Sequence, residues 1–324
     1  MKKNNIKKFF IIFLLVITLS GCNTVLKDKD NKPVRNNETG QNITENILCR
    51  PTDKKLIKIY EENGKDLKEL SDCNKMKAFD KYEGIWTTVF VKPLAFLIIK
   101  LGNVVKSQGL SIIIITIIIR LLLFPITKKT AMQSETIKQA QPELERLEKK
   151  YANKTDNASL EKKQMEMLAI YKKYNINPLS GCIFAFIQLP LLFAFLEAIN
   201  RVPAIFEETF LHFQMGTTPW IALSHGKWYY LILVVLIIGT TFLSFKMNQS
   251  SSINEEMEKQ NKMMMIFMTI FIGFTSFTLP SAIAIYWITS SLFTIGQNFI
   301  TDKSIRSKRK WINKHLLVKP KKKQ

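Results

Sequence analysis

The chain has 324 residues, of which 47% are hydrophobic and 23% charged, and its mean hydropathy is close to zero. Such an average arises when apolar blocks alternate with charged ones, which is typical of a polytopic membrane protein and excludes a single soluble core. The net charge of +21 lies mainly beside the apolar runs, where it orients a chain in a bilayer, so it does not by itself indicate a nucleic-acid binder.

The first segment, residues 1–21, has the form of a secretory signal peptide. Lysines precede an apolar run from Phe9 to Ile17, and small residues follow that run. The ending LSGC at 19–22 is similar to a bacterial lipobox, so we predict that Cys22 becomes the acylated first residue of a lipoprotein, carrying palmitate or a related acyl chain. An ordinary signal or an uncleaved anchor is the alternative.

Residues 22–84 are polar and nearly balanced in charge, which predicts an exported tether with little core. If Cys22 lies outside the membrane, Cys49 and Cys73 also lie in an oxidising location. Such a location permits a disulfide between these two cysteines, and the sequence leaves their pairing open.

The next segment, residues 85–108, mixes aromatic and aliphatic side chains with lysines and a proline. A charged segment interrupted by proline is a poor membrane span, so we predict an interfacial amphipathic helix. A membrane core at 109–300 follows, with five apolar runs long enough to cross a bilayer. We predict these spans at 110–126, 181–199, 228–245, 263–279 and 281–300.

Between the first two spans, residues 127–180 place apolar side chains at steps of three and four residues, flanked by charges. This period predicts two amphipathic helices that form a cytoplasmic helical hairpin. A coiled-coil decoration without a specific partner is the alternative for the same pattern.

The distribution of basic residues gives the orientation. With Cys22 outside, five crossings place the hairpin, the 246–262 loop and the basic tail at 301–324 in the cytoplasm. These segments contain 11, 3 and 10 basic residues, whereas the 200–226 loop outside contains one. The positive-inside rule therefore agrees with a multi-pass protein of the bacterial cell membrane that is anchored by lipid on the outer face.

Arg120 is a permanent charge near the middle of the first span. A guanidinium at the centre of a membrane helix costs roughly 2.5–3.5 kcal/mol and cannot lose its proton, so it must face protein or water. The predicted spans contain a single acid, Glu197, near the far end of its helix. We therefore favour a wet functional pocket over a buried ion pair for this arginine.

The fifth span carries polar side chains on one helical face, which needs another helix or a water-filled space beside it. With Arg120 and Gln188, they predict a shared hydrophilic groove; ordinary hydrogen bonding between helices is the alternative for the stripe alone. The side chains that form this polar face are Trp287, Ser290, Thr294 and Gln297.

The sequence offers no catalytic or metal site. The three histidines, His212, His225 and His315, lie outside the predicted spans and are scattered along the chain, and no glycine-rich phosphate loop occurs. We therefore expect no metal, no cofactor and no enzymatic activity.

These residues resemble those of the YidC/Oxa1/Alb3 membrane protein insertases, in the lipoprotein form found in Gram-positive bacteria. The resemblance runs from Trp86 to Gln297. It departs from the family pattern at Phe184, Thr269 and Ser291. The residues that carry it are Arg120 with Phe124-Pro125-Ile126, the run QPELERLEKKY at 141–151, Asn177-Pro178-Leu179 with Gly181-Cys182, Gln188-Leu189-Pro190, and Tyr286-Trp287 with Ser290 and Gln297.

The resemblance implies five spans around a hydrophilic groove that contains Arg120 and is open to the cytoplasm and the lipid. It implies an insertase and chaperone that acts on nascent membrane proteins, alone or with the Sec translocon. It also implies that the hairpin receives a nascent chain or a targeting factor. The tail at 301–324 either contacts ribosomal RNA without sequence specificity or rests on anionic lipid.

Two other functions remain alternatives at this point. An anion transporter or channel would use Arg120 as its binding site and predicts internal repeats, which the sequence does not contain. A lipoprotein enzyme would need a nucleophile and a base in its exported part, and that part offers no plausible pair.

Overall fold

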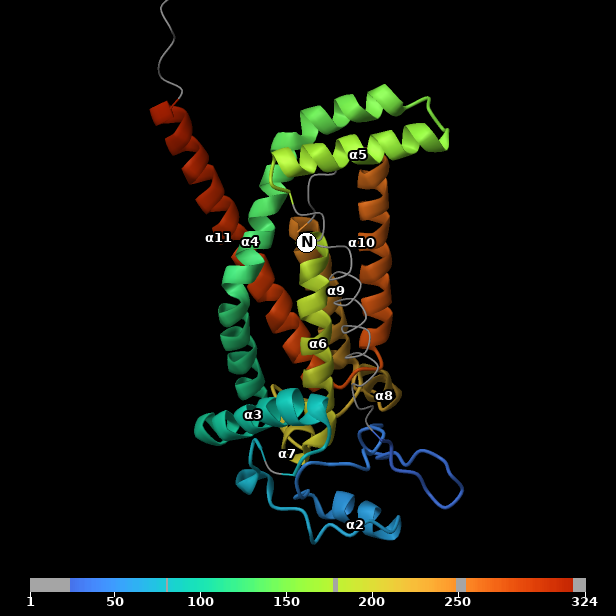
Figure 1. Cartoon of the computed structure of the whole chain (residues 1–324). Coiled ribbons are helices and arrows are strands. Elements are labelled where there is room, and N and C mark those ends of the chain that lie inside the picture. Colours follow the sequence, from blue (N-terminus) through green and yellow to red (C-terminus); the bar gives the residue numbers. More distant parts are fainter. Residues whose placement is uncertain (1–23, 80, 177–179, 249–254, 317–324) are drawn as a thin grey trace, which may run out of the picture. The chain divides into compact units, whose positions relative to one another are not determined.

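A computed structural model describes residues 24–79, 81–176, 180–248 and 255–316 (Figure 1). The described chain is mostly helical and contains one two-stranded antiparallel sheet, formed by β1 (Thr209–Phe210) and β2 (Phe213–Gln214). It divides into two compact units. The first unit comprises Met1–Ile118, Ile187–Ile237 and Ile272–Thr289, and the second comprises Ile119–Phe186, Ile238–Phe271 and Ser290–Gln324.

The α-helices follow one another along the chain, and the two longest connections between them are residues 63–91, between α2 and α3, and residues 207–218, between α7 and α8. Shorter helical turns occur at Cys73–Lys75, Thr87–Val91 and Trp228–Tyr230. The helices are α2 (Lys54–Glu62), α3 (Lys92–Val105), α4 (Gln108–Tyr151), α5 (Asn157–Lys173), α6 (Ser180–Arg201), α7 (Pro203–Phe206), α8 (Pro219–Ser224), α9 (Leu231–Asn248), α10 (Glu255–Ser276) and α11 (Ser281–Leu316).

Among the described residues, three helical stretches are long and apolar enough to cross a membrane: Thr87–Val105, Gln108–Lys129 and Trp228–Met247. The last two coincide with the predicted spans at 110–126 and 228–245. A shorter apolar stretch, Asn261–Ser276, lies in the predicted fourth span. The described chain is therefore a helical membrane protein as predicted, while the count of five spans stays a prediction.

The stretch Thr87–Val105 is apolar on two faces. One face of α3 is buried against the protein through Leu94, Ala95 and Ile98, whereas Leu97 and Val104 on the other face are exposed. In Figure 1 the axis of α3 runs at a steep angle to that part of α6 which belongs to the same unit. Length and composition also allow this stretch to span a membrane, so its predicted position at the interface is not tested.

The helix α4 is continuous from the first predicted span into the first helix of the hairpin. It runs through Pro125 and Pro142, where the sequence predicts a change from span to hairpin after residue 126. Each proline removes one backbone donor from the helix but does not end it. Likewise, α11 continues past the predicted end of the fifth span at residue 300 to Leu316, and residues 317–324 of the tail lie outside the described chain.

The predicted hairpin is present in the second unit as the distal part of α4 and α5. Ala140, Leu144 and Ile176 form its buried cluster, with Ile137, Met167 and Tyr171 packed against it. Ion pairs join the charged flanks: Lys150 to Glu166 at 2.6 Å and Lys173 to Glu143 at 2.5 Å. The apolar period of three and four residues therefore marks the face that the two helices share.

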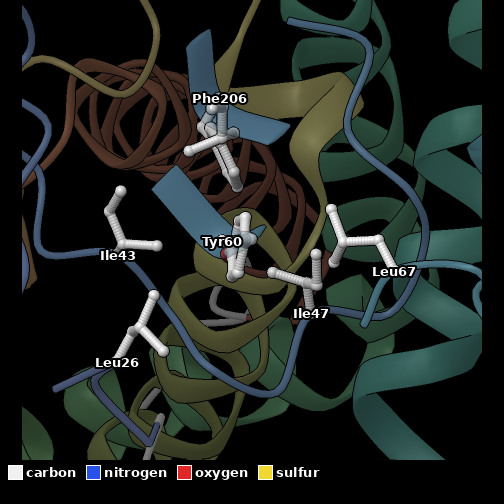
Figure 2. Packing of buried hydrophobic residues seen from close by; sticks show 7 residues of the cluster. Leu26, Ile43, Ile47, Tyr60, Leu67 and Phe206 are labelled. Atoms are coloured by element: carbon white, nitrogen blue, oxygen red, sulfur yellow. The ribbon is translucent and has the colours of Figure 1, made fainter. Parts of the chain in front are cut away.

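Residues 24–79 form a module with its own core, which differs from the predicted tether. Figure 2 shows Tyr60 of α2 at the centre of this core. Its hydroxyl donates to the backbone oxygen of Thr44 at 2.5 Å. A disulfide joins Cys49 to Cys73. The polar composition of the segment conceals this core, because its few apolar residues are far apart in the sequence. The buried cluster consists of Leu26, Ile43, Ile47, Leu56, Tyr60, Leu67 and Phe206 of α7.

Candidate functional site

Arg120 is buried on α4, with 4% of its surface exposed. Its Nη2 group donates a hydrogen bond to the hydroxyl of Ser290 on α11. The hydroxyl of Thr294, one turn further along α11, donates to the backbone oxygen of Ser290 at 3.0 Å. In the second unit the predicted span arginine therefore lies against the polar face predicted on the fifth span.

A second polar contact joins α4 and α11 about two helical turns further along both helices. The hydroxyl of Thr127 lies 3.1 Å from Oε1 of Gln297. Ser290, Thr294 and Gln297 are all buried. Sequence reasoning missed Thr127, although its spacing from Arg120 places it on the same side of α4. The two contacts give the interface between these helices a polar character inside an otherwise apolar region.

The other two residues predicted for the groove, Gln188 and Trp287, belong to the first unit. The amide of Gln188 on α6 donates to the hydroxyl of Tyr286 at 3.3 Å. Tyr286 is fully buried and stacks on Phe195, with ring centroids 4.2 Å apart. Trp287 is half-buried and packs against the cluster around Tyr230. A polar group and aromatic rings therefore meet where α6 and α11 pack in this unit.

Four charged side chains, three of them buried, form a second polar cluster in the first unit, which we call the charged quartet: Glu83, Lys92, Glu197 and Arg201. Arg201 donates to Glu197 at 2.9 Å and also forms an ion pair with Glu83. Lys92 contacts Glu83 at 2.8 Å. Lys92 and Arg201 are each 2% exposed. Two cations therefore face two carboxylates, and the cluster is neutral.

Hydrogen bonds to neighbouring groups complete the quartet. The indole nitrogen of Trp86 donates to Glu197 at 2.9 Å, and the hydroxyl of Thr87 donates to it at 3.3 Å. Arg201 also donates to the backbone oxygen of Asn46, at 2.7 Å. The quartet thus connects the module at residues 24–79 and the segment just before α3 to the end of α6. Buried ions of this kind persist only when their donors and acceptors are matched.

The quartet changes the ionisation of Glu83. Partial burial favours the neutral acid, but the hydrogen bonds from Lys92 and Arg201 outweigh it, so the pKa of Glu83 lies below its ordinary value. Sequence reasoning identified Glu197 as an isolated acid and did not pair it. The partners come from three distant segments, and no periodic pattern connects them.

The lipidation site predicted at Cys22 lies outside the described residues. Across the described ranges, no group of three or more histidine, cysteine or acidic side chains is arranged to hold a metal ion.

Comparison with known proteins places these features in a broader context. The chain matches the family described as 60Kd inner membrane protein over residues 100–309. It is 35% identical to a protein named membrane protein insertase YidC from Oceanobacillus iheyensis, over 70% of this chain and 87% of that protein. It is 39% identical to a protein of the same name from Alkalihalophilus pseudofirmus, over 68% of this chain and 82% of that protein.

A solved structure titled "Active YidC insertase crystal structure with the first transmembrane domain resolved" is 23% identical. It covers 66% of this chain and 46% of its own chain, with a TM-score of 0.48. The family match includes Arg120 and the polar face of α11, whereas the module at residues 24–79 lies outside it.

Proposed function

The chain belongs to the 60Kd inner membrane protein family, and from this premise we propose that it is a membrane protein insertase and chaperone. It is a membrane protein that acts on other membrane proteins, inserting them into the bilayer and helping them to fold. The relatives to which it is similar are named membrane protein insertase, and the similarity covers most of their own length. In this proposal it is not an enzyme, since moving a chain into lipid forms and breaks no covalent bond.

The observation that carries the proposed mechanism is the position of Arg120. This permanent cation is buried on an apolar helix and donates to Ser290, with Thr294 and Gln297 on the same face of α11. A charge in a membrane helix is expensive and is usually found at a functional position. We propose that Arg120 and this polar face line a hydrophilic groove that receives the polar segment of a substrate.

The groove would shorten the apolar distance that a polar segment must cross. Arg120 would attract acidic side chains in that segment, while hydroxyl and amide groups would replace part of its hydration. Burial of one large apolar side chain contributes roughly 1.5–3 kcal/mol. A substrate helix of about 20 apolar residues therefore outweighs the cost of moving a few polar groups, and no nucleotide site is required.

Other parts of the chain have supporting roles in this proposal. Gln188 and Trp287 would provide further contacts to the substrate. The cytoplasmic hairpin would receive the nascent chain, and the ribosome and the Sec translocon would be partners for larger substrates. An acyl chain on Cys22 would anchor the exported module to the outer face of the bacterial cell membrane.

Complementation of a strain depleted of its own insertase tests the proposal. Arg120→Ala should lower the insertion of a substrate with an acidic N-terminal tail by at least about tenfold, which corresponds to the loss of one buried charge interaction. Arg120→Lys should retain part of the activity because it keeps the charge.

Lys129→Ala is the matched control, since it removes an exposed cation from the same helix and should insert the substrate normally. Full complementation by Arg120→Ala would contradict the electrostatic role of Arg120.

A further inference from the structure

The first turn of α4 is separated from α3 by a left-handed residue and is capped by a serine side chain. Lys106 has a left-handed backbone conformation, with φ at 57°, and this separates α3 from α4. Ser107 then caps the new helix, because its hydroxyl oxygen accepts from the backbone N–H of Leu110 at 3.2 Å. The first N–H groups of a helix have no partner within the helix and carry its positive dipole end. They therefore need an external acceptor.

Glu208 supplies that acceptor from a loop far along the chain. Its carboxylate accepts a hydrogen bond from the hydroxyl of Ser107 at 2.6 Å. It also accepts hydrogen bonds from the backbone N–H groups of Gln108 and Gly109, the latter at 3.5 Å. An anion at this position neutralises the end of the helix dipole and binds several donors at once. The same carboxylate thus holds the axial position and the rotation of the first turn of α4.

The loop that carries Glu208 also holds the helix sterically. The backbone oxygen of Glu208 accepts from the N–H of Met215 at 2.9 Å, which closes the loop around β1 and β2. A side chain added at Gly109 would lie 2.6 Å from Cβ of Phe210. Such a separation is far below ordinary contact, so the loop fits against α4 only because residue 109 is glycine.

We propose that Glu208 is a positioning residue for Arg120. Arg120 follows on the same helix, about 18 Å from Gln108 at the usual rise of 1.5 Å per residue. A helix whose first turn is held by a charged cap and by a close steric fit has little freedom to slide or rotate. Glu208 therefore sets the depth and the direction at which Arg120 meets a substrate. This inference rests on the proposed function of Arg120.

The neighbouring residue provides a natural comparison. The carboxylate of Glu207 accepts from the N–H of Thr52 at 3.2 Å and from the hydroxyl of Thr52 at 2.5 Å. It also accepts from the N–H of Asp53, at 3.3 Å, just before α2 of the module at residues 24–79. Two adjacent glutamates thus hold two different helix starts. Only Glu208 holds the helix that carries Arg120.

The test measures insertion of a substrate whose translocated segment carries one acidic residue, moved through successive positions. With the wild-type protein, insertion should be highest at one group of positions. In Glu208→Ala, the ratio of insertion at the best position of the acidic residue to insertion at the worst position should fall by about threefold. This factor corresponds to losing one anionic cap. Glu208→Gln keeps one acceptor oxygen, so its ratio should lie between those of the wild type and Glu208→Ala. Glu207→Ala should keep the wild-type dependence of insertion on position.

A steric variant tests the same inference without removing the carboxylate. Gly109→Ala should flatten the profile as Glu208→Ala does. Phe210→Gly in the same chain should restore it, because this change removes both the Cβ and the ring that the added methyl group would meet. Hydrogen exchange should confirm that the first turn of α4 opens faster in Glu208→Ala, while the rest of the protein stays folded.

If all positions lose insertion equally and the profile keeps its shape, Glu208 stabilises the fold and does not position Arg120. If the wild-type protein itself shows no dependence on the acidic position, the proposed function of Arg120 fails instead.

Discussion

Two buried arginines in this protein have contrasting surroundings. Arg201 in the first unit meets two carboxylates, Glu83 and Glu197, and its other contacts are hydrogen bonds to neutral groups. Arg120 in the second unit donates to a hydroxyl, and the polar residues placed with it on α11 are uncharged. Both guanidinium groups are almost fully buried, so burial alone does not distinguish them.

The difference indicates two uses of a buried cation. A cation matched by carboxylates forms a neutral cluster that joins segments of the protein, and its removal leaves an uncompensated charge. We propose that a cation which donates to a neutral hydroxyl, as Arg120 does to Ser290, can also attract a passing acidic group. We therefore expect Arg201 to govern stability and Arg120 to govern activity.

The largest expected effect on stability follows from Arg201→Ala. Removing this side chain takes the cation away from Glu197 and leaves Glu83 with Lys92, and breaking a buried ion pair in this way costs roughly 3–5 kcal/mol. The free energy of unfolding, measured in nanodiscs, should fall by that amount. Adding Glu197→Gln should recover part of the loss, because the cluster becomes neutral again. The comparison breaks down if Arg120→Ala destabilises the protein as much as Arg201→Ala does.

The disulfide provides the next largest effect. Cys49 and Cys73 are separated by 24 residues, and closing a loop of that length stabilises a protein by about 3 kcal/mol. Cys49→Ser with Cys73→Ser should therefore make the module at residues 24–79 sensitive to proteases, whereas the second unit should resist cleavage as before. Limited proteolysis with and without a reducing agent measures both outcomes. Equal cleavage of the module in both forms would show that its core does not depend on the disulfide.

A smaller effect is expected from Tyr60→Phe in the module core. This change keeps the ring but leaves the buried backbone oxygen of Thr44 without its donor, at a cost of roughly 1–2 kcal/mol in the free energy of unfolding. The thermal unfolding midpoint should decrease while insertion at permissive temperature remains normal. Loss of insertion without any change in this midpoint would show that the module participates directly in activity.

The smallest effect is the response of the charged quartet to acid. Because the pKa of Glu83 is lowered in the folded protein, its ionised form contributes stability above its ordinary value of 4.5. That contribution is lost as pH falls through the lowered pKa. Its side chain is 39% exposed, so solvent screens the effect. Unfolding midpoints between pH 3 and 6 should fall less steeply in Glu83→Gln than in the wild type, and parallel curves would contradict this assignment.

Periodic features were accessible from the sequence. The steps of three and four residues predicted that Ser290, Thr294 and Gln297 share a face, and the same steps predicted the apolar face of the hairpin around Leu144. A period along one helix specifies which side chains lie together, whatever the partner is. The contact of Arg120 with this face therefore agrees with what the pattern favours.

Contacts between distant segments were not accessible. Lys92, Glu83 and Arg201 meet because three separate segments converge, and Glu208 reaches the start of α4 from a loop. The core of the module at residues 24–79 was also missed, because scattered apolar residues such as Leu26 and Leu67 form no period. In each case the information lies in the tertiary arrangement and leaves no local pattern.

Cross-linking from Ser290→Cys to a stalled nascent membrane protein tests most directly whether a substrate's polar segment reaches the site of Arg120. The account predicts a disulfide between this position and a cysteine in the polar translocated segment of the substrate. Ile266→Cys, on an exposed part of α10, should give much less of this product. Absence of the cross-link from Ser290→Cys, or equal cross-linking from both positions, would contradict the account.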